Sequence, residues 1–161
     1  MANISSEAIN ELIKDFFSSI ENFQFTSMDE LDSKVVLVDD SYSPVSRDDL
    51  LAIAKDNPLN VPPGTLKTQL TDCDDYALQL KAIAMANCRQ RHITDSGQPL
   101  PPAIAIVISQ NHAVNLFVEQ DSEGNNSLCF LDASTPGFPM GSEPEQAAQI
   151  MKQPPLKLIY M

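Results

Sequence analysis

The sequence predicts an α+β fold, and three patterns in its 161 residues carry that prediction. Apolar residues recur at spacings of three and four in several segments, which is typical of amphipathic helices. Three short apolar runs follow one another with only polar connections between them, which favours an antiparallel meander. Hydrophobic residues make up 43% and charged residues 20% of the chain, close to the globular average, so we expect one folded domain.

The N-terminal region is predicted to hold two helices and a strand. A helix over residues 5–20 has an apolar stripe behind a serine cap. A strand is predicted over residues 34–38. The second helix begins at Ser46 and ends before Pro58, because a proline disfavours the helical conformation of the residue before it.

A proline-rich stretch, residues 57–64, is predicted to be a linker. It separates residues 1–60, an N-terminal helical layer packed on the core, from residues 61–161, the core itself. The N-terminal layer has two alternative roles, a lid or an inhibitory segment. We favour packing, because its helices have apolar stripes that must be buried.

The core is predicted to open with a helix that Asp72 caps and that runs to about Arg89, with Asp75 at its third position. Apolar, β-branched strands follow, and the polar segment 121–126 has the composition of a hairpin turn. The strands are predicted over residues 103–109, 112–120 and 127–133.

The C-terminal end is predicted to hold a short helix and a closing strand. Ser142 and Glu145 have the spacing of a capping box, which indicates the start of the helix. Pro154 and Pro155 end it, and residues 156–161 are typical of a strand.

The net charge of −12 and the isoelectric point near 4.3 oppose binding to phosphate backbones, so we expect no nucleic-acid partner. The N-terminus lacks the pattern of a signal peptide, and no apolar run approaches the roughly 18 residues of a membrane span. We therefore expect a cytoplasmic, acidic protein with no membrane partner. Three cysteines without CxxC spacing argue against a disulfide framework and a zinc site.

Cys73 lies in the first turn of the predicted core helix, where the helix dipole favours a thiolate. Asp72, Asp74 and Asp75 act in the opposite direction, because neighbouring negative charges raise the pKa of a thiol. A nearby imidazolium would favour the thiolate. The sequence holds two histidines, and only His112 begins a predicted strand.

His112 and Asp132 are predicted to lie on the same face of neighbouring strands, where each needs a polar partner. If the numbers of paired residues add up to 244 or 246, Asp132 lies opposite His112 or diagonal to it. A sum of 245 would separate them. The pattern predicts a triad in which Cys73 attacks, His112 moves the proton and Asp132 orients the imidazole.

Each of these residues also has an ordinary structural interpretation. A cysteine in a helix is usually a small buried apolar residue, and a histidine on a strand is usually a core residue with a satisfied hydrogen bond. An aspartate before Ala-Ser-Thr often forms a turn. The order and facing of all three together favour the catalytic interpretation.

Three segments resemble a known family: Asp72-Cys73-Asp74-Asp75-Tyr76-Ala77, Asn111-His112-Ala113-Val114-Asn115 and Cys129-Phe130-Leu131-Asp132. They resemble the papain-like and transglutaminase-like cysteine peptidase superfamily. Within it they are most similar to the C-terminal peptidase domain of mushroom agglutinins and to bacterial transglutaminase-like cysteine proteinases. The resemblance covers about residues 66–137.

The resemblance implies a papain-like core in which the nucleophile helix packs on an antiparallel sheet. It also implies calcium as a candidate cofactor, with Asp72, Asp74 and Asp75 as candidate ligands, although helix capping explains these residues more simply. In papain relatives a glutamine before the cysteine completes the oxyanion hole. Gln69 is the candidate here, at an interval that differs from that of papain.

The function predicted from these observations is a hydrolase of the thiol protease class. It would cut or transfer at a peptide or isopeptide bond of a peptide or protein substrate, through Cys73, His112 and Asp132. The alternative is a non-catalytic acidic module that keeps the fold and binds a protein. The short chain, which leaves little room for a substrate lobe, and the aspartates around Cys73 favour that alternative.

Overall fold

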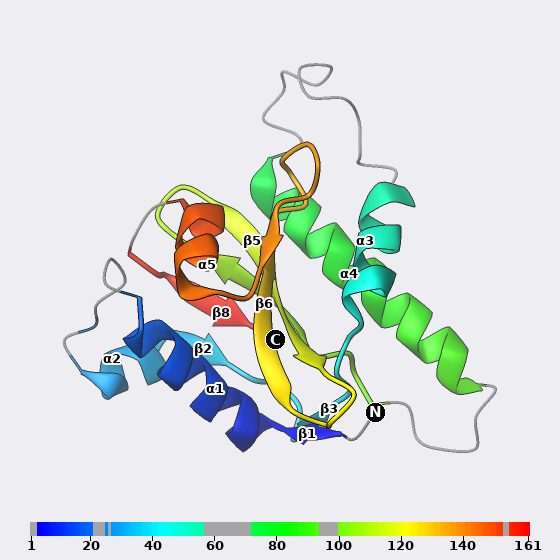
Figure 1. Ribbon diagram of the computed structural model, residues 1–161, viewed down its shortest axis with the longest axis horizontal. Coiled ribbons are helices and arrows are strands. Elements are labelled where there is room, and N and C mark those ends of the chain that lie inside the picture. The colour runs from blue at the N-terminus through cyan, green and yellow to red at the C-terminus, as the bar shows by residue number, and fades with distance from the viewer. Residues whose placement is uncertain (1–2, 21–24, 26, 57–71, 94–99, 153–154) are drawn as a thin grey trace.

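The computed structural model describes residues 3–20, 25, 27–56, 72–93, 100–152 and 155–161 (Figure 1). The helices are α1 (Ser6–Ser18), α2 (Met28–Asp32), α3 (Arg47–Asp56), α4 (Cys73–Ile93) and α5 (Pro144–Met151). The strands are β1 (Ile4–Ser5), β2 (Val35–Val36), β3 (Ser41–Tyr42), β4 (Ile104–Ile108), β5 (Ala113–Gln120), β6 (Asn126–Leu131), β7 (Met140–Gly141) and β8 (Leu158–Tyr160). The presence of both helices and strands confirms the prediction of a mixed class.

The main sheet has the order β2-β8-β4-β5-β6-β7, and β1 and β3 form a separate small pair. The predicted meander is present as β4, β5 and β6, which pair antiparallel in sequence order. The prediction of an antiparallel sheet is wrong at one edge, because β2 pairs parallel with β8. Since β2 and β8 lie near opposite ends of the chain, no hairpin signal in the sequence links them.

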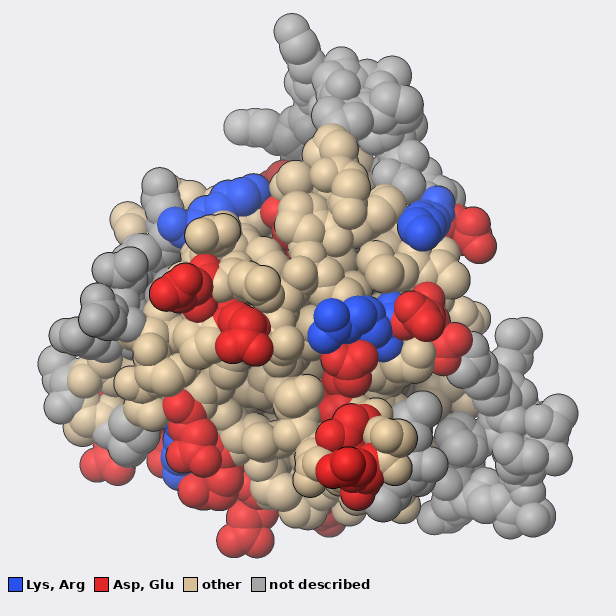
Figure 2. All heavy atoms as spheres, viewed as in Figure 1, with Lys and Arg blue, Asp and Glu red and all other residues tan. Residues whose placement is uncertain are grey.

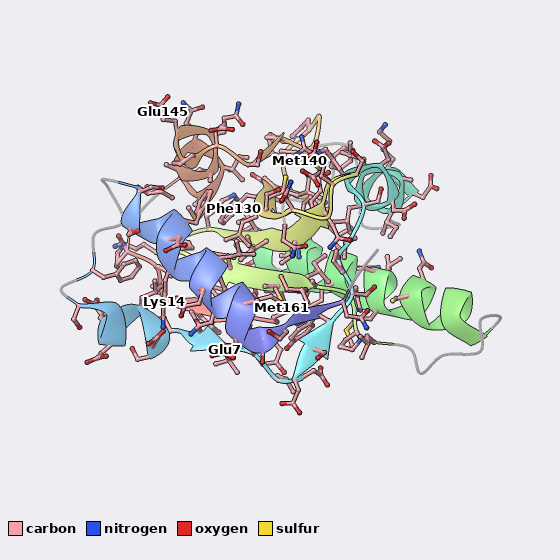
Figure 3. The ribbon with its side chains drawn as sticks, turned by 60° about the horizontal axis from the view of Figure 1, so that its bottom comes forward. Glu7, Lys14, Phe130, Met140, Glu145 and Met161 are labelled. Atoms are coloured by element: carbon pink, nitrogen blue, oxygen red, sulfur yellow. The ribbon has the colours of Figure 1, made fainter. Side chains whose placement is uncertain are left out.

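Two apolar cores lie on the two faces of the sheet. On one face, α1 and α5 cover β6, and the ring of Phe130 stacks on that of Phe16 with centroids 5.1 Å apart (Figure 3). On the other face, α3 and α4 bury Leu50 and Leu80 against Phe117 of β5. The molecule is therefore a sheet between two helical layers (Figure 1).

The long elements agree with the sequence prediction. Ser5 caps α1 by accepting a hydrogen bond from the backbone of Ala8 at 3.2 Å. At α4, the Asp75 carboxylate accepts a hydrogen bond from the Asp72 backbone at 3.2 Å, as the predicted cap requires. The same helix continues beyond the predicted end at Arg89 to Ile93.

The predicted capping box at α5 is wrong. Glu143, not Ser142, occupies the cap position, and its side chain makes no capping hydrogen bond. Pro144 takes the first helical position, where its fixed backbone angle suits a helix start. The elements that the sequence did not indicate, among them α2, β3 and β7, are too short to show a periodicity.

The predicted linker over residues 57–64 lies almost wholly outside the described residues. Residues 1–60 contribute α1 to one face of the sheet and β2 to its edge. In the view of Figure 2, acidic side chains are spread over the surface and basic side chains are few, in line with the net charge of −12. Within the described part of the chain, no helix is long and apolar enough to cross a membrane.

Candidate functional site

Cys73 is the first residue of α4, and its thiol lies against the start of β5. The backbone N–H of Ala113 donates a hydrogen bond to Sγ at 3.3 Å. Asn115, also on β5, donates from its amide to the carbonyl oxygens of Ala77 at 2.9 Å and Ala105 at 3.3 Å. These contacts tie the beginning of α4 to the sheet and fix the position of the half-buried thiol.

His112 and Asp132 meet where β5 begins and β6 ends. Their Nε2 and Oδ2 atoms lie 2.9 Å apart, and their side chains are 8% and 1% exposed. Asn115 pairs with Leu131 in the hairpin, so the paired numbers add up to 246, one of the two sums predicted to bring these residues together. The sequence prediction that His112 and Asp132 share a face is confirmed.

Asp132 is held by a dense set of donors. Its Oδ1 accepts hydrogen bonds from the backbone N–H groups of Ser134 at 2.9 Å and Thr135 at 3.1 Å, and from the Ser134 hydroxyl at 2.6 Å. Its Oδ2 accepts from the Thr135 hydroxyl at 2.7 Å and the Lys152 ammonium at 3.1 Å. Burial alone would raise the pKa of Asp132, but the hydrogen bonds from His112, Ser134 and Thr135 hold it well below its usual range.

The electrostatics of the site favour an ion pair between thiolate and imidazolium. The hydrogen bond to Asp132, with a second one to Cys73, raises the pKa of His112 to about 9. The hydrogen bond with His112 lowers the pKa of the Cys73 thiol, although burial opposes that change. Because Nε2 faces Asp132, Nδ1 is the ring nitrogen that remains for the thiol. We call Cys73, His112 and Asp132 the thiol site; its chemical capacity is that of an activated nucleophile.

The aspartates around Cys73 lie at the exposed start of α4. Asp75 accepts the capping hydrogen bond, and the side-chain hydrogen bond with Asp72 raises the pKa of Asp74. In the part of the chain that the structure describes, no group of three or more His, Cys, Asp or Glu residues is arranged to hold a metal ion. The calcium ligands therefore gain no support from this arrangement. Gln69, the candidate for the oxyanion hole, lies outside the described residues.

Sequence reasoning missed the partners that hold Asp132. Ser134 and Thr135 lie two and three residues after it and were interpreted only as part of a turn. Hydroxyl residues in a turn that follows a carboxylate are the signal that could have found them. Lys152 follows α5 in an unusual conformation, with φ at 64°. No local pattern indicates that its ammonium reaches Asp132, because the contact depends on how α5 packs on the sheet.

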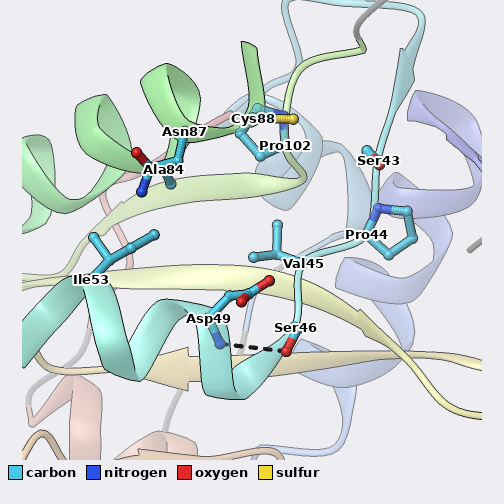
Figure 4. A pocket seen from close by; sticks show the side chains of 10 residues that line it. All are labelled: Ser43, Pro44, Val45, Ser46, Asp49, Ile53, Ala84, Asn87, Cys88 and Pro102. Atoms are coloured by element: carbon cyan, nitrogen blue, oxygen red, sulfur yellow. Dashed lines mark hydrogen bonds between the residues drawn. The ribbon is translucent and has the colours of Figure 1, made fainter. Parts of the chain in front are cut away.

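A separate cleft of about 250 Å³ lies between α3 and α4 (Figure 4). Ile53 and Asp49 come from α3, and Ala84, Asn87 and Cys88 come from α4. The cleft combines an apolar floor with a carboxylate, an amide and a hydroxyl group. We call it the α3/α4 cleft. It is lined by Ser43, Pro44, Val45, Ser46, Asp49, Ile53, Ala84, Asn87, Cys88 and Pro102.

Comparisons with protein-family models and with curated proteins gave no match. Among solved structures, the fold is similar to that of a lectin from Polyporus squamosus. PSL1a in complex with E64 is 15% identical, with a TM-score of 0.65 over 99% of this chain and 50% of that chain. The lectin bound to the human-type influenza-binding epitope Neu5Aca2-6Galb1-4GlcNAc is 17% identical, with a TM-score of 0.53 over 84% of this chain and 44% of that chain.

At these identities the likeness shows the fold alone, and the chain spans about half the length of the lectin structures that it matches. The finding corrects the family predicted from the sequence, because the fold is found in a lectin and neither structure is described as a peptidase. The predicted peptidase or amidase, its hydrolase class and its peptide or protein substrate depended on that family and are corrected with it. The segments around Cys73, His112 and Asp132 define the chemical surroundings of the thiol, and these surroundings alone do not define a reaction.

Proposed function

We propose that the chain is a binding protein with a lectin-like fold, and that the thiol site is where it holds a ligand covalently. One arrangement carries the proposal: the half-buried thiol of Cys73 lies beside a buried imidazole that Asp132 holds in place, and the hydrogen bond with His112 lowers the pKa of the thiol. A structural cysteine would need no such neighbours. PSL1a has a similar fold, and its complex with E64 supports the proposal that a chain of this fold binds a ligand.

The chemistry expected at the site is alkylation of a thiolate. E64 is an epoxide: the Cys73 thiolate attacks a ring carbon, the ring C–O bond breaks, and the oxygen takes a proton from His112. The products are a thioether and a hydroxyl group, so charge and atoms balance. The hydrogen bond from the Ala113 backbone positions the Cys73 sulfur atom at the start of β5, and the hydrogen bond with Asp132 orients the imidazolium of His112.

The test is to treat the reduced chain with E64 at neutral pH and to locate the adduct by peptide mass mapping. We expect one adduct, on Cys73, with little on Cys88, which is also half-buried but lines the α3/α4 cleft. The His112→Ala variant should react at least about tenfold more slowly, since it loses the proton donor and the imidazolium. Equal labelling of Cys73 and Cys88, or no adduct at all, would contradict the proposal.

Glycan binding is the second candidate, supported by the lectin structure that holds Neu5Aca2-6Galb1-4GlcNAc and by the α3/α4 cleft. Carbohydrates are recognised by carboxylate, amide and hydroxyl groups beside apolar surface, and Asp49, Asn87 and Ser46 supply them here. Because Asp49 lines the cleft and the chain is acidic overall, we expect a neutral glycan to bind better than a sialylated one.

This candidate is tested by NMR titration with Galb1-4GlcNAc and with the sialylated trisaccharide. We expect chemical-shift changes confined to the residues that line the cleft, larger for the neutral disaccharide and lost in the Asn87→Ala variant. The Cys73→Ala variant is the matched control and should bind the glycan unchanged. Shift changes elsewhere, or none at millimolar glycan, would argue against the cleft.

A further inference from the structure

Lys81 of α4 is a buried lysine that does not contact the residues of the thiol site. Its side chain is 9% exposed, and lysine is seldom buried without a charged partner in contact. The ammonium donates one hydrogen bond, to the carbonyl oxygen of Tyr160 at 3.2 Å, and lies 4.5 Å from the centroid of the Tyr160 ring. Within the described residues it forms no ion pair at contact distance.

A cavity of about 150 Å³ adjoins this amine; we call it the Lys81 cavity. Its apolar wall includes Val38 and Met85, while Tyr42, Tyr160 and Asp39 add polar groups. The volume suits a molecule of a few heavy atoms. The residues that line it are Val38, Asp39, Tyr42, Lys81, Met85, Pro101, Pro102, Tyr160 and Met161.

Tyr42 gives the cavity a hydrogen-bond donor. Its hydroxyl oxygen accepts a hydrogen bond from the Asp39 backbone at 2.9 Å, so its own proton is free to be donated, and the described residues offer that proton no acceptor. Burial raises the pKa of Tyr42, which keeps the phenol protonated. A carbonyl oxygen in the cavity could accept this proton while its carbon faces an amine.

Three other described lysines, Lys14, Lys34 and Lys152, each have a carboxylate partner that Lys81 lacks. Lys14 and Lys34 lie within 3.6 Å of carboxylates, and Lys152 lies 3.1 Å from Asp132. Desolvation lowers the pKa of Lys81 to about 8, although the charge of Asp39 opposes the change. At pH 7.5 about a quarter of such amines are uncharged, against about one in a thousand at an ordinary lysine.

From this geometry we propose that Lys81 is a modification site, whose amine condenses with a small uncharged aldehyde bound in the Lys81 cavity. The amine nitrogen attacks the carbonyl carbon and gives up its two protons, and the carbonyl oxygen takes up two protons and leaves as water, so that an imine remains. An uncharged aldehyde is favoured over an aldehyde acid, because Asp39 lines the cavity and the reacting amine carries no charge. Tyr42 is the donor to the carbonyl oxygen.

The test treats the folded chain with glycolaldehyde at pH 7.5 and traps the imine with cyanoborohydride, which reduces it to a secondary amine. Peptide mapping then gives the rate at each lysine. We expect Lys81 to be labelled at least about tenfold faster than Lys34 and Lys152, because more of its amine is uncharged. Equal or slower labelling of Lys81 would overturn the proposal.

Two variants test whether the fast labelling belongs to Lys81 and depends on Tyr42. Tyr42→Phe should slow labelling of Lys81 several-fold and leave Lys34 unchanged, whereas Lys81→Arg keeps the charge and should remove the fast phase altogether. Raising the pH to 10 should reduce the selectivity, because the exposed lysines then lose their protons too. The titratable groups that face Lys81 are Asp39, Tyr42 and Tyr160. A fast phase that persists in Lys81→Arg would place the reactive amine elsewhere.

Discussion

Cys73 and Cys129 are the same side chain in opposite surroundings. Cys73 begins α4 at the end of the sheet, where His112 lowers the pKa of its thiol. Cys129 lies in the middle of β6, fully buried between the sheet and the α3/α4 layer, and burial raises the pKa of its thiol to about 11. A half-buried position beside an imidazolium thus favours the thiolate, whereas an apolar core excludes it.

The comparison also separates two roles for burial. Around Cys129, burial removes water and outweighs the opposing charge of Arg47, so the neutral thiol is favoured. Around Asp132, burial is nearly as complete, yet the donors on four neighbouring groups keep the carboxylate charged. Burial alone therefore predicts neither the charge nor the reactivity of a group; its hydrogen-bond partners decide both.

The largest effect is expected from Asp132→Asn. The change leaves the buried imidazolium without its anion and weakens the hydrogen bonds from Ser134 and Thr135, so we expect about 3 kcal/mol less free energy of unfolding near pH 6. Urea denaturation of both proteins measures it. A loss below about 1 kcal/mol would show that the pair adds little to stability.

The pH dependence of that loss follows from the two pKa shifts. The raised pKa of His112 contributes stability that is present below about 6.5 and is lost as the pH rises through about 9. The lowered pKa of Asp132 contributes stability that is present above about 3.9 and is lost as the pH falls through its folded pKa. The difference between wild type and Asp132→Asn should therefore be largest between about pH 4 and 6.5.

The next effect concerns the reactivity of Cys73. In His112→Ala the thiol loses the imidazolium, its pKa rises, and its alkylation by iodoacetamide at pH 6 should slow by about tenfold or more. Cys129 is the internal control and should stay unreactive in both folded proteins, then react once urea unfolds them. An unchanged rate at Cys73 would mean that α4 alone activates the thiol.

A smaller effect is expected from Cys129→Ser. The new hydroxyl enters an apolar core where the carbonyl oxygen of Phe130, 4.0 Å from the sulfur, is too distant for an O–H donor, so the free energy of unfolding should fall by about 1–2 kcal/mol. Cys129→Ala is the matched control, since it leaves a small void but no polar group. Cys73→Ser, at the half-buried position, should change stability less than Cys129→Ser; the reverse order in thermal melts would contradict the contrast between the two sites.

The smallest effect is expected at Lys152, where two substitutions separate charge from backbone strain. Both Lys152→Ala and Lys152→Gly remove the ammonium that lowers the pKa of His112, so that pKa should rise slightly in each, as NMR titration would show. Glycine tolerates the positive φ of 64°, so Lys152→Gly should be more stable than Lys152→Ala by about 1 kcal/mol. Equal stabilities would mean that the conformation is not strained.

Much of the fold follows from local signals in the sequence. The spacing of apolar residues predicted α1, α3 and α4, and short apolar runs predicted β4, β5 and β6, because the signals of a helix or a strand lie in neighbouring residues. The hairpin arithmetic also brought His112 and Asp132 together, since register and strand alternation follow from a short turn. The family suggested by the same residues was wrong, because three short segments constrain a fold far less than its whole backbone does.

By itself, the sequence determined the longer helices, the meander, the acidic composition and the pairing of a histidine with an aspartate. Only the tertiary structure decided that β2 joins β8 in parallel, that Lys152 reaches Asp132, and that Lys81 is buried beside Tyr160. These contacts join residues far apart in the chain. They depend on how whole layers pack on the sheet, and a periodicity read over a few neighbouring residues holds no information about that packing.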